Sequence, residues 1–153
     1  MESLHVRIFP HSQDEFPSED SLLTWLLTSL RARGGEYYLR HSDSVKDLPP
    51  GSVVLFRYGH EIVGEAVVWK GKEVFPDKVK DRTLTGEEAE YGAKVTFASS
   101  SIRLYAPPLP VERLQLHLPE KDVVKFAGAY TSLDWSIYGR ILHEVVSSGV
   151  FVS

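Results

Sequence analysis

The chain has 153 residues, of which 42% are hydrophobic and 25% charged, a composition typical of one soluble globular domain. Its net charge of −4 argues against a protein covered in positive potential, so any nucleic-acid partner has to be held by a local basic patch. Zero cysteines exclude disulfides, thiolate metal sites and cysteine nucleophiles.

The chain also lacks membrane and export signals. No apolar run approaches the roughly 18 residues that a membrane span requires, and the first ten residues alternate polar and apolar instead of forming a signal peptide. We therefore expect a single domain over residues 1–153, a cytoplasmic location and no membrane partner.

The first predicted elements are a strand and a helix. Alternating apolar residues between Leu4 and Ile8 predict a short strand that ends at Pro10. Ser18 is placed to cap a helix over about residues 19–33, in which leucines keep helical spacing until two glycines stop it.

A hairpin is predicted next, after a compact strand at residues 36–40. Residues 51–70 read GSVVLFRYGHEIVGEAVVWK, two runs that are apolar on both faces and suit central strands. Gly64 permits a bulge, a sharp bend or the close approach of another backbone. The charged segment that follows, residues 70–92, is longer than a tight connection and predicts a binding loop or a mobile one.

The remaining pattern alternates strand and helix. AKVTFASSSIRLYAPPLP predicts a long strand, and residues 111–116 and 122–126 predict single helical turns. Thr131 and Asp134 form a capping-box pattern before a terminal helix with an apolar stripe that starts at Trp135. This order predicts an α+β fold with a small, mainly antiparallel β-barrel flanked by helices.

Three stretches resemble one superfamily. LPPGSVVLFRYGHEIVGEAVV is similar to the glycine turn and paired strands of PUA-like domains, which include the EVE, ASCH and YTH modules. SIRLYAPPLPVERLQ resembles the family's strand, proline turn and short helix, and LDWSIYGRIL its closing helix. The resemblance implies a pseudobarrel that recognises nucleic acid, and in the EVE and YTH branches a pocket that receives a modified base.

The sequence departs from that family in two places. HVRIF does not carry the early tryptophan of the EVE opening, and the ASCH motif is missing from the N-terminal part, which weakens an amidohydrolase interpretation.

The aromatic residues suggest where a base would bind. A flipped base needs flat walls for stacking and polar groups to read its edge. Trp69 ends a strand beside Lys70 and is the most attractive wall, although it would equally serve to cover a barrel end. Trp25 and Trp135 lie on helical stripes, where core packing is favoured. The expected ligand-binding residues are Trp69, Tyr58, Glu65, Ser99 and Ser101.

The basic residues suggest where phosphates would bind. Arg57 and Arg103 fall inside apolar strands, so each needs a carboxylate partner or an open end, and Glu65 is the obvious internal partner. Glu65 would alternatively read a base edge. The expected contacts to the nucleic-acid backbone are Arg57, Lys70, Lys72, Lys78, Lys80, Arg82 and Arg103.

Recognised catalytic motifs are missing. The six histidines show no zinc-ligand spacing, and no nucleophile elbow, Walker loop or dinucleotide fingerprint is present. We therefore expect no metal, no cofactor and no catalytic residue. The expected function is that of a reader of DNA or RNA, which holds a modified base in an aromatic pocket. One alternative is a small amidohydrolase acting on a modified nucleoside, with Glu65 as acid or base and Lys94 assisting. The other is a protein-interaction domain that uses an exposed sheet edge or apolar patch.

Overall fold

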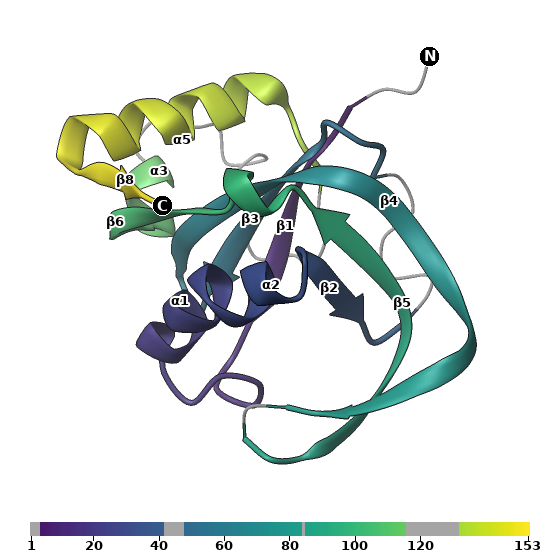
Figure 1. Cartoon of the computed structure of the whole chain (residues 1–153). Helices are drawn as coiled ribbons and strands as arrows, with labels where there is room; N and C mark the ends of the chain where they lie inside the picture. The colour runs from purple at the N-terminus through teal and green to yellow at the C-terminus, as the bar shows by residue number, and fades with distance from the viewer. Residues whose placement is uncertain (1–3, 42–47, 84, 116–131) are drawn as a thin grey trace.

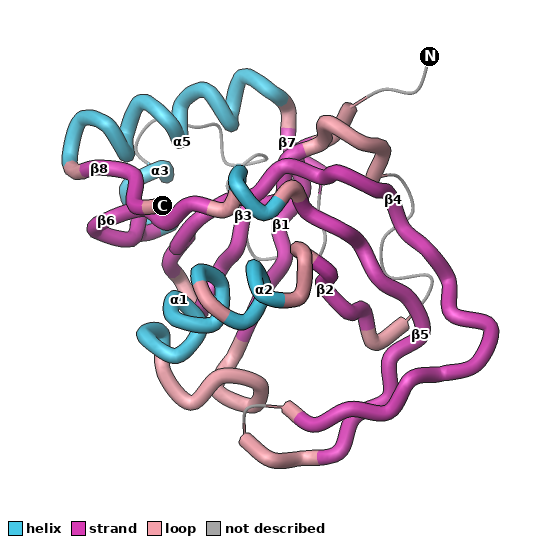
Figure 2. Tube along the Cα trace, viewed as in Figure 1, coloured by secondary structure: helices cyan, strands magenta, loops and turns pink. Residues whose placement is uncertain are grey.

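The computed structural model describes residues 4–41, 48–83, 85–115 and 132–153. The predicted turn at 122–126 and Thr131 of the predicted capping box lie outside the described residues. The elements, shown in Figures 1 and 2, are β1 (Val6–His11), α1 (Glu19–Leu27), α2 (Ser29–Ala32), β2 (Glu36–Leu39), β3 (Val53–Tyr58), β4 (Glu61–Arg82), β5 (Glu88–Phe97), a 3₁₀ turn (Ser99–Ser101), β6 (Arg103–Pro110), α3 (Val111–Gln115), β7 (Ser132–Leu133), α5 (Trp135–Ser148) and β8 (Val150–Val152).

The strands form one mixed sheet in the order β2-β5-β4-β3-β1-β7, with β6 pairing with both β4 and β8. β1 runs parallel to β3, and the other pairings among the described strands are antiparallel. The predicted α+β fold with a mainly antiparallel sheet is confirmed. The described pairings leave the sheet open and do not close it into the expected barrel.

β4 is the longest strand and changes partners along its length. Residues 61–67 pair with β3 on one edge, while the other edge pairs first with β6 and then with β5. The long strand predicted at 93–110 is therefore two strands separated by the 3₁₀ turn.

The charged segment predicted as a loop is instead a two-stranded ribbon. β4 continues to Arg82 and β5 begins at Glu88, so the two strands leave the sheet together and curl round (Figure 1). Most side chains on the outer part of the ribbon are exposed on both faces. Because neither face of this segment is buried, apolar and polar residues do not alternate in it, and the sequence pattern did not indicate strands. The prediction of a loop was wrong.

Helices cover both faces of the sheet. α1 and α2 lie against one face and α5 against the other (Figure 1). Alternate residues of the hairpin enter the two cores, with Val54 and Phe56 in the first and Val53 and Leu55 in the second. The prediction that the hairpin strands are apolar on both faces is confirmed.

The helix ends follow local chemistry. Ser18 caps α1 as predicted, because its Oγ accepts from the Ser21 N–H at 3.2 Å and the Ser21 Oγ accepts from the Ser18 N–H at 3.1 Å. The predicted single helix over 19–33 is interrupted at Thr28, whose hydroxyl donates to the Thr24 carbonyl at 2.6 Å.

Trp135 does not pack in the core as expected. It is 44% exposed, and its Nε1–H donates to the Leu4 carbonyl at 3.3 Å. The buried face of α5 is formed by Ile137, Ile141 and Val145. Trp135 is the first residue of the helix, and it lies at the border of the core.

Gly64 marks the closest approach of two strands. A Cβ placed there would lie 2.5 Å from the Arg103 carbonyl oxygen, and the pairing of β3 with β4 is irregular at the neighbouring residues. The predicted bulge with close backbone approach is confirmed at this position.

Gly64→Ala should lower the free energy of unfolding by about 1–3 kcal/mol, because β4 and β6 would have to separate. Gly139→Ala is the matched control: nothing lies within 4 Å of its Cβ in α5, so the change should stabilise the protein by about 0.5–1 kcal/mol. Urea unfolding measures both. Equal midpoints for Gly64→Ala and the wild type would contradict this account of the strand approach.

Candidate functional site

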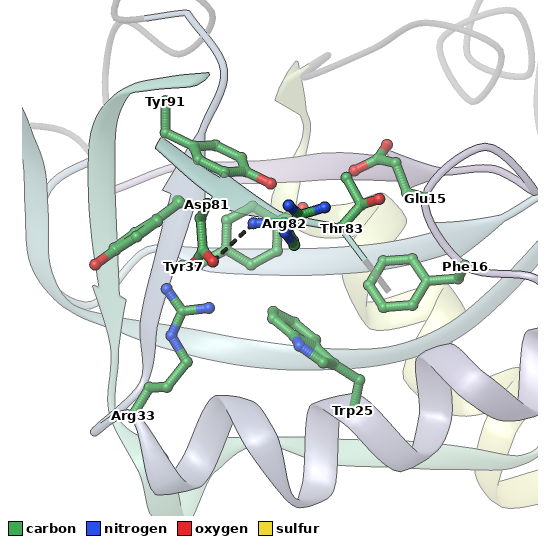
Figure 3. Close-up of a pocket in the computed structure, with 10 residues that line it drawn as sticks. Glu15, Phe16, Trp25, Arg33, Tyr37, Asp81, Arg82, Thr83 and Tyr91 are labelled. Atoms are coloured by element: carbon green, nitrogen blue, oxygen red, sulfur yellow. Dashed lines mark hydrogen bonds between the residues drawn. The ribbon is translucent and has the colours of Figure 1, made fainter. Parts of the chain in front are cut away.

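An aromatic pocket lies where the ribbon turns back over α1 and β2 (Figure 3). Thr85, near the ribbon tip, donates from its hydroxyl to the Asp14 carbonyl at 3.2 Å and so links the ribbon to the loop before α1. The cavity volume is about 80 Å³, and the empty space rises to about 550 Å³ when the open mouth is counted. Its lining residues are Glu15, Phe16, Trp25, Arg33, Tyr37, Tyr38, Asp81, Arg82, Thr83 and Tyr91.

The aromatic walls are tilted against one another. Trp25 lies edge-on to Phe16, with ring centroids 5.5 Å apart, and edge-on to Tyr37, with centroids 5.9 Å apart. Tyr38 and Tyr91 form a second tilted pair at 5.5 Å. Figure 3 shows Trp25 projecting from α1 on one side of the pocket and Tyr91 from β5 on the other. Edge-to-face packing fixes these rings and leaves ring surface at the cavity.

Tyr37 is held in place by a buried histidine. The Nδ1 of His11 lies 3.2 Å from the Arg57 carbonyl oxygen, which only accepts, so Nδ1 carries the proton. The Nε2 then accepts from the Tyr37 hydroxyl at 2.7 Å. Burial lowers the pKa of His11 from the ordinary 6.5 to about 4, so the ring is neutral and keeps this arrangement at physiological pH.

Two carboxylates and two guanidinium groups line the pocket. Burial raises the pKa of Glu15, while the charge of Arg40 opposes that shift. The Oδ1 of Asp81 accepts from the backbone N–H of Arg82 at 2.7 Å (dashed in Figure 3). The Arg33 guanidinium lies 4.3 Å from the Tyr38 ring centroid, and the Nη1 of Arg82 donates to the Gly86 carbonyl at 3.0 Å.

A second depression adjoins the pocket and shares Asp81 and Arg82 with it. Lys80 and Glu88 complete its lining, and its volume is about 350 Å³. Two of the predicted backbone contacts, Lys80 and Arg82, therefore lie beside the aromatic pocket. Lys70 and Lys78 are exposed elsewhere along β4, and Lys72 and Arg57 are half-buried.

The residues expected to bind the ligand do not line this pocket. Trp69 is 65% exposed, so it covers no core, and it lies outside both described cavities. Tyr58 supports the pocket from behind, because its hydroxyl donates to the Phe16 carbonyl at 2.8 Å. Ser99 and Ser101 belong to the 3₁₀ turn, where the Ser101 Oγ accepts from the Val67 N–H at 2.8 Å.

Glu65 lies in a buried polar cluster on the α5 side of the sheet. Its Oε1 accepts from the Tyr105 hydroxyl at 2.7 Å, and its Oε2 accepts from the Tyr138 hydroxyl at 2.6 Å and lies 3.3 Å from Arg103. Burial and the Glu65 carboxylate raise the pKa of both tyrosines, so they remain donors. The ion pair predicted for Glu65 is formed by Arg103, whereas Arg57, the other predicted partner, lies opposite Ile62 in the register of β3 with β4.

Lys94, the expected assistant of Glu65 in a hydrolase, has other partners. Its Nζ donates to Glu36 at 2.8 Å and lies 3.9 Å from Glu73. The two groups share no partner in the described part of the chain, which does not support the acid–base pair of the alternative prediction.

In residues 4–41, 48–83, 85–115 and 132–153, no group of three histidine or carboxylate side chains could hold a metal ion. None of the described helices is long and apolar enough to cross a membrane.

No protein-family model matches this chain, and no curated protein is significantly similar to it. The chemistry of the pocket is therefore the basis on which a function is proposed.

The sequence did not reveal most of the pocket because its walls come from separate segments. Phe16 lies in a loop, Trp25 on α1, Tyr37 and Tyr38 on β2 and Tyr91 on β5. One signal was present: adjacent tyrosines on a strand face opposite sides, so one of the pair had to leave the core. Trp25 packs against the first core, as expected, and also lines the cavity.

His11 makes stability depend on pH. Its pKa is about 4 in the folded protein and near 6.5 when unfolded, so the unfolded chain binds the proton first and stability falls as pH drops through that window. The loss should reach up to about 3 kcal/mol. Glu19 acts in the opposite direction, because burial and Glu61 raise its folded pKa to about 7.

The contribution of His11 is isolated by comparison with His11→Gln. Urea unfolding at several pH values between 7 and 4 should show a steeper loss of stability in the wild type than in the variant. Parallel curves for the two proteins would show that His11 is not the group responsible.

Proposed function

We propose that this protein is a PUA-like nucleic-acid-binding module that holds a base of DNA or RNA, in particular a modified base, in the aromatic pocket. The observation that carries the proposal is the convergence of five aromatic side chains on one open cavity. Aromatic faces stack on any base, and such contacts tolerate different sequences.

The surroundings of the pocket fit a nucleotide. The adjoining depression places Lys80 and Arg82 beside the cavity, where the phosphates flanking an extruded base would lie. The enclosed volume of about 80 Å³ is below the roughly 300–1,000 Å³ of drug-sized pockets, so a base would occupy the mouth as well.

The proposal keeps the fold type and moves the site. A curled, mainly antiparallel sheet covered by helices is compatible with a PUA-like pseudobarrel. Trp25 and Tyr91 replace Trp69 as the proposed base-stacking residues. A cytoplasmic location agrees with the cysteine-free composition. We propose no chemistry, because the Glu65 carboxylate is saturated by two tyrosines and an arginine.

A second candidate function is protein binding through β8. This strand pairs with β6 on one edge, and Val150 is 60% exposed. In that case the protein would bind no oligonucleotide.

Tyr91→Ala should weaken oligonucleotide binding by roughly 5- to 150-fold, because stacking on an aromatic residue contributes about 1–3 kcal/mol per base. Tyr91→Phe keeps the ring and should retain most of the affinity. Fluorescence anisotropy at about 50 mM salt, with methylated and hydroxymethylated DNA and RNA oligonucleotides, measures the dissociation constants.

Trp69→Ala is the control for the position of the site, since Trp69 is a larger aromatic residue on the same pair of strands. Its affinity should match the wild type. If Trp69→Ala loses affinity and Tyr91→Ala does not, the site lies at Trp69. If the wild type binds no oligonucleotide at this salt concentration, the proposed function is wrong.

Lys80→Gln should weaken binding to modified and unmodified oligonucleotides equally. Loss of one phosphate contact should reduce the slope of log K against log salt by roughly 0.7 to 0.9. Titrations between about 50 and 200 mM salt measure this slope, and an unchanged slope would remove Lys80 from the interface.

A further inference from the structure

The carboxylates of the aromatic pocket are not neutralised by the protein. Neither Glu15 nor Asp81 forms a salt bridge in the described part of the chain. Asp81 accepts only from the Arg82 backbone N–H, and Glu15 is influenced by Arg40 through charge alone. The raised pKa of Glu15 shows that its carboxylate is desolvated without full compensation.

The guanidinium groups that line the pocket keep their positive charge, but each contacts a partner other than the two carboxylates. Arg33 lies against the Tyr38 ring, and Arg82 donates to the Gly86 carbonyl. Arg40 lies 5.7 Å from the Tyr91 centroid, outside the set of lining residues. Cations already face two of the tyrosine rings, whereas the half-buried Trp25 meets no cation in the described contacts.

Aromatic faces beside unneutralised carboxylates favour a flat cation. The ring quadrupole attracts positive charge, and a desolvated carboxylate attracts it more strongly than one in water. A neutral base of the same size gains the stacking contact and lacks both electrostatic contributions.

We propose that the base selected by this pocket is positively charged at neutral pH, as the ring-N-alkylated bases 1-methyladenine and 3-methylcytosine are in a nucleotide. This inference rests on the proposed function and names its ligand class. A nucleotide of this kind has a cationic base and an anionic phosphate. The base lies near Glu15 and Asp81, and the phosphate lies near Lys80 and Arg82 in the adjoining depression.

The test compares two isomers that differ in charge. Short RNA oligonucleotides carry either one 1-methyladenosine, which is cationic at neutral pH, or one N6-methyladenosine, which is neutral. A parallel pair of DNA oligonucleotides carries the corresponding deoxynucleosides, so the two arms distinguish RNA from DNA as the source of the base. Trp25 is a lining residue, so its fluorescence reports binding to the whole chain.

The cationic isomer should bind at least tenfold more tightly than the neutral one. Glu15→Gln should reduce that ratio by roughly tenfold, because the side-chain shape is kept and the negative charge is lost. Glu90→Gln removes the same charge from an exposed position of β5 outside the pocket, and the preference should persist. Asp81→Asn should act in the same direction as Glu15→Gln.

The outcomes separate the two proposals. Equal or tighter binding of the N6-methyl isomer overturns the cationic ligand class, while nucleic-acid binding stands. A preference for the cation that survives Glu15→Gln and Asp81→Asn also overturns it, because the charge would then be recognised elsewhere. Absence of binding to every oligonucleotide overturns the proposed function together with this inference.

Discussion

The contact between β4 and β6 at Gly64 is the constraint on which the rest of the sheet depends. β4 meets β3 on one edge and must accept β6 and β5 in succession on the other. Only a residue without a side chain allows the Arg103 carbonyl to come so close. The 3₁₀ turn between β5 and β6 is closed by Ser101, whose hydroxyl donates to the Ala98 carbonyl at 2.7 Å. At their other ends, away from this turn, β4 and β5 leave the sheet together as a ribbon. This ribbon forms one side of the aromatic pocket.

Glu65 and His11 are both buried, and the cost of removing each ionisable group from water is offset in a different way. Glu65 is surrounded by an arginine and two tyrosine hydroxyls, so three donors compensate the loss of water around its carboxylate. His11 gives up its charge, and its two ring nitrogens match one acceptor and one donor. The first arrangement joins β4, β6 and α5, and the second orients a wall of the pocket. Polar groups thus stabilise both faces of the sheet.

Much of the fold was predictable because local rules apply to it. The Ser18 cap, the two apolar faces of the hairpin and the special role of Gly64 all follow from side-chain size and spacing. The partner of Arg103 was predictable because a buried carboxylate on a neighbouring strand was available. The strands of the outer ribbon were not predictable, since strand alternation is visible in a sequence only where one face of the strand is buried. The aromatic pocket was not predictable, because Trp25 and Tyr91 lie far apart in the sequence and no short stretch of residues contains both. Trp69 was favoured as the base-stacking residue because it lies beside lysines in the sequence. That criterion does not show whether other aromatic side chains lie close to it in the fold.

The pairing of β1 has a consequence for how the chain reaches this structure. Val6 pairs with Val53 on one side and with Leu133 on the other, so one of the first strands is completed by residues near the opposite end of the sequence. Contacts between such distant residues have high contact order, and chains that rely on them fold slowly. Until β7 pairs with it, the outer edge of β1 presents unpaired backbone groups to any neighbouring chain, and the described part of β7 covers two residues. When the protein refolds at high concentration, strand edges of other molecules therefore compete with β7 for pairing with this edge of β1.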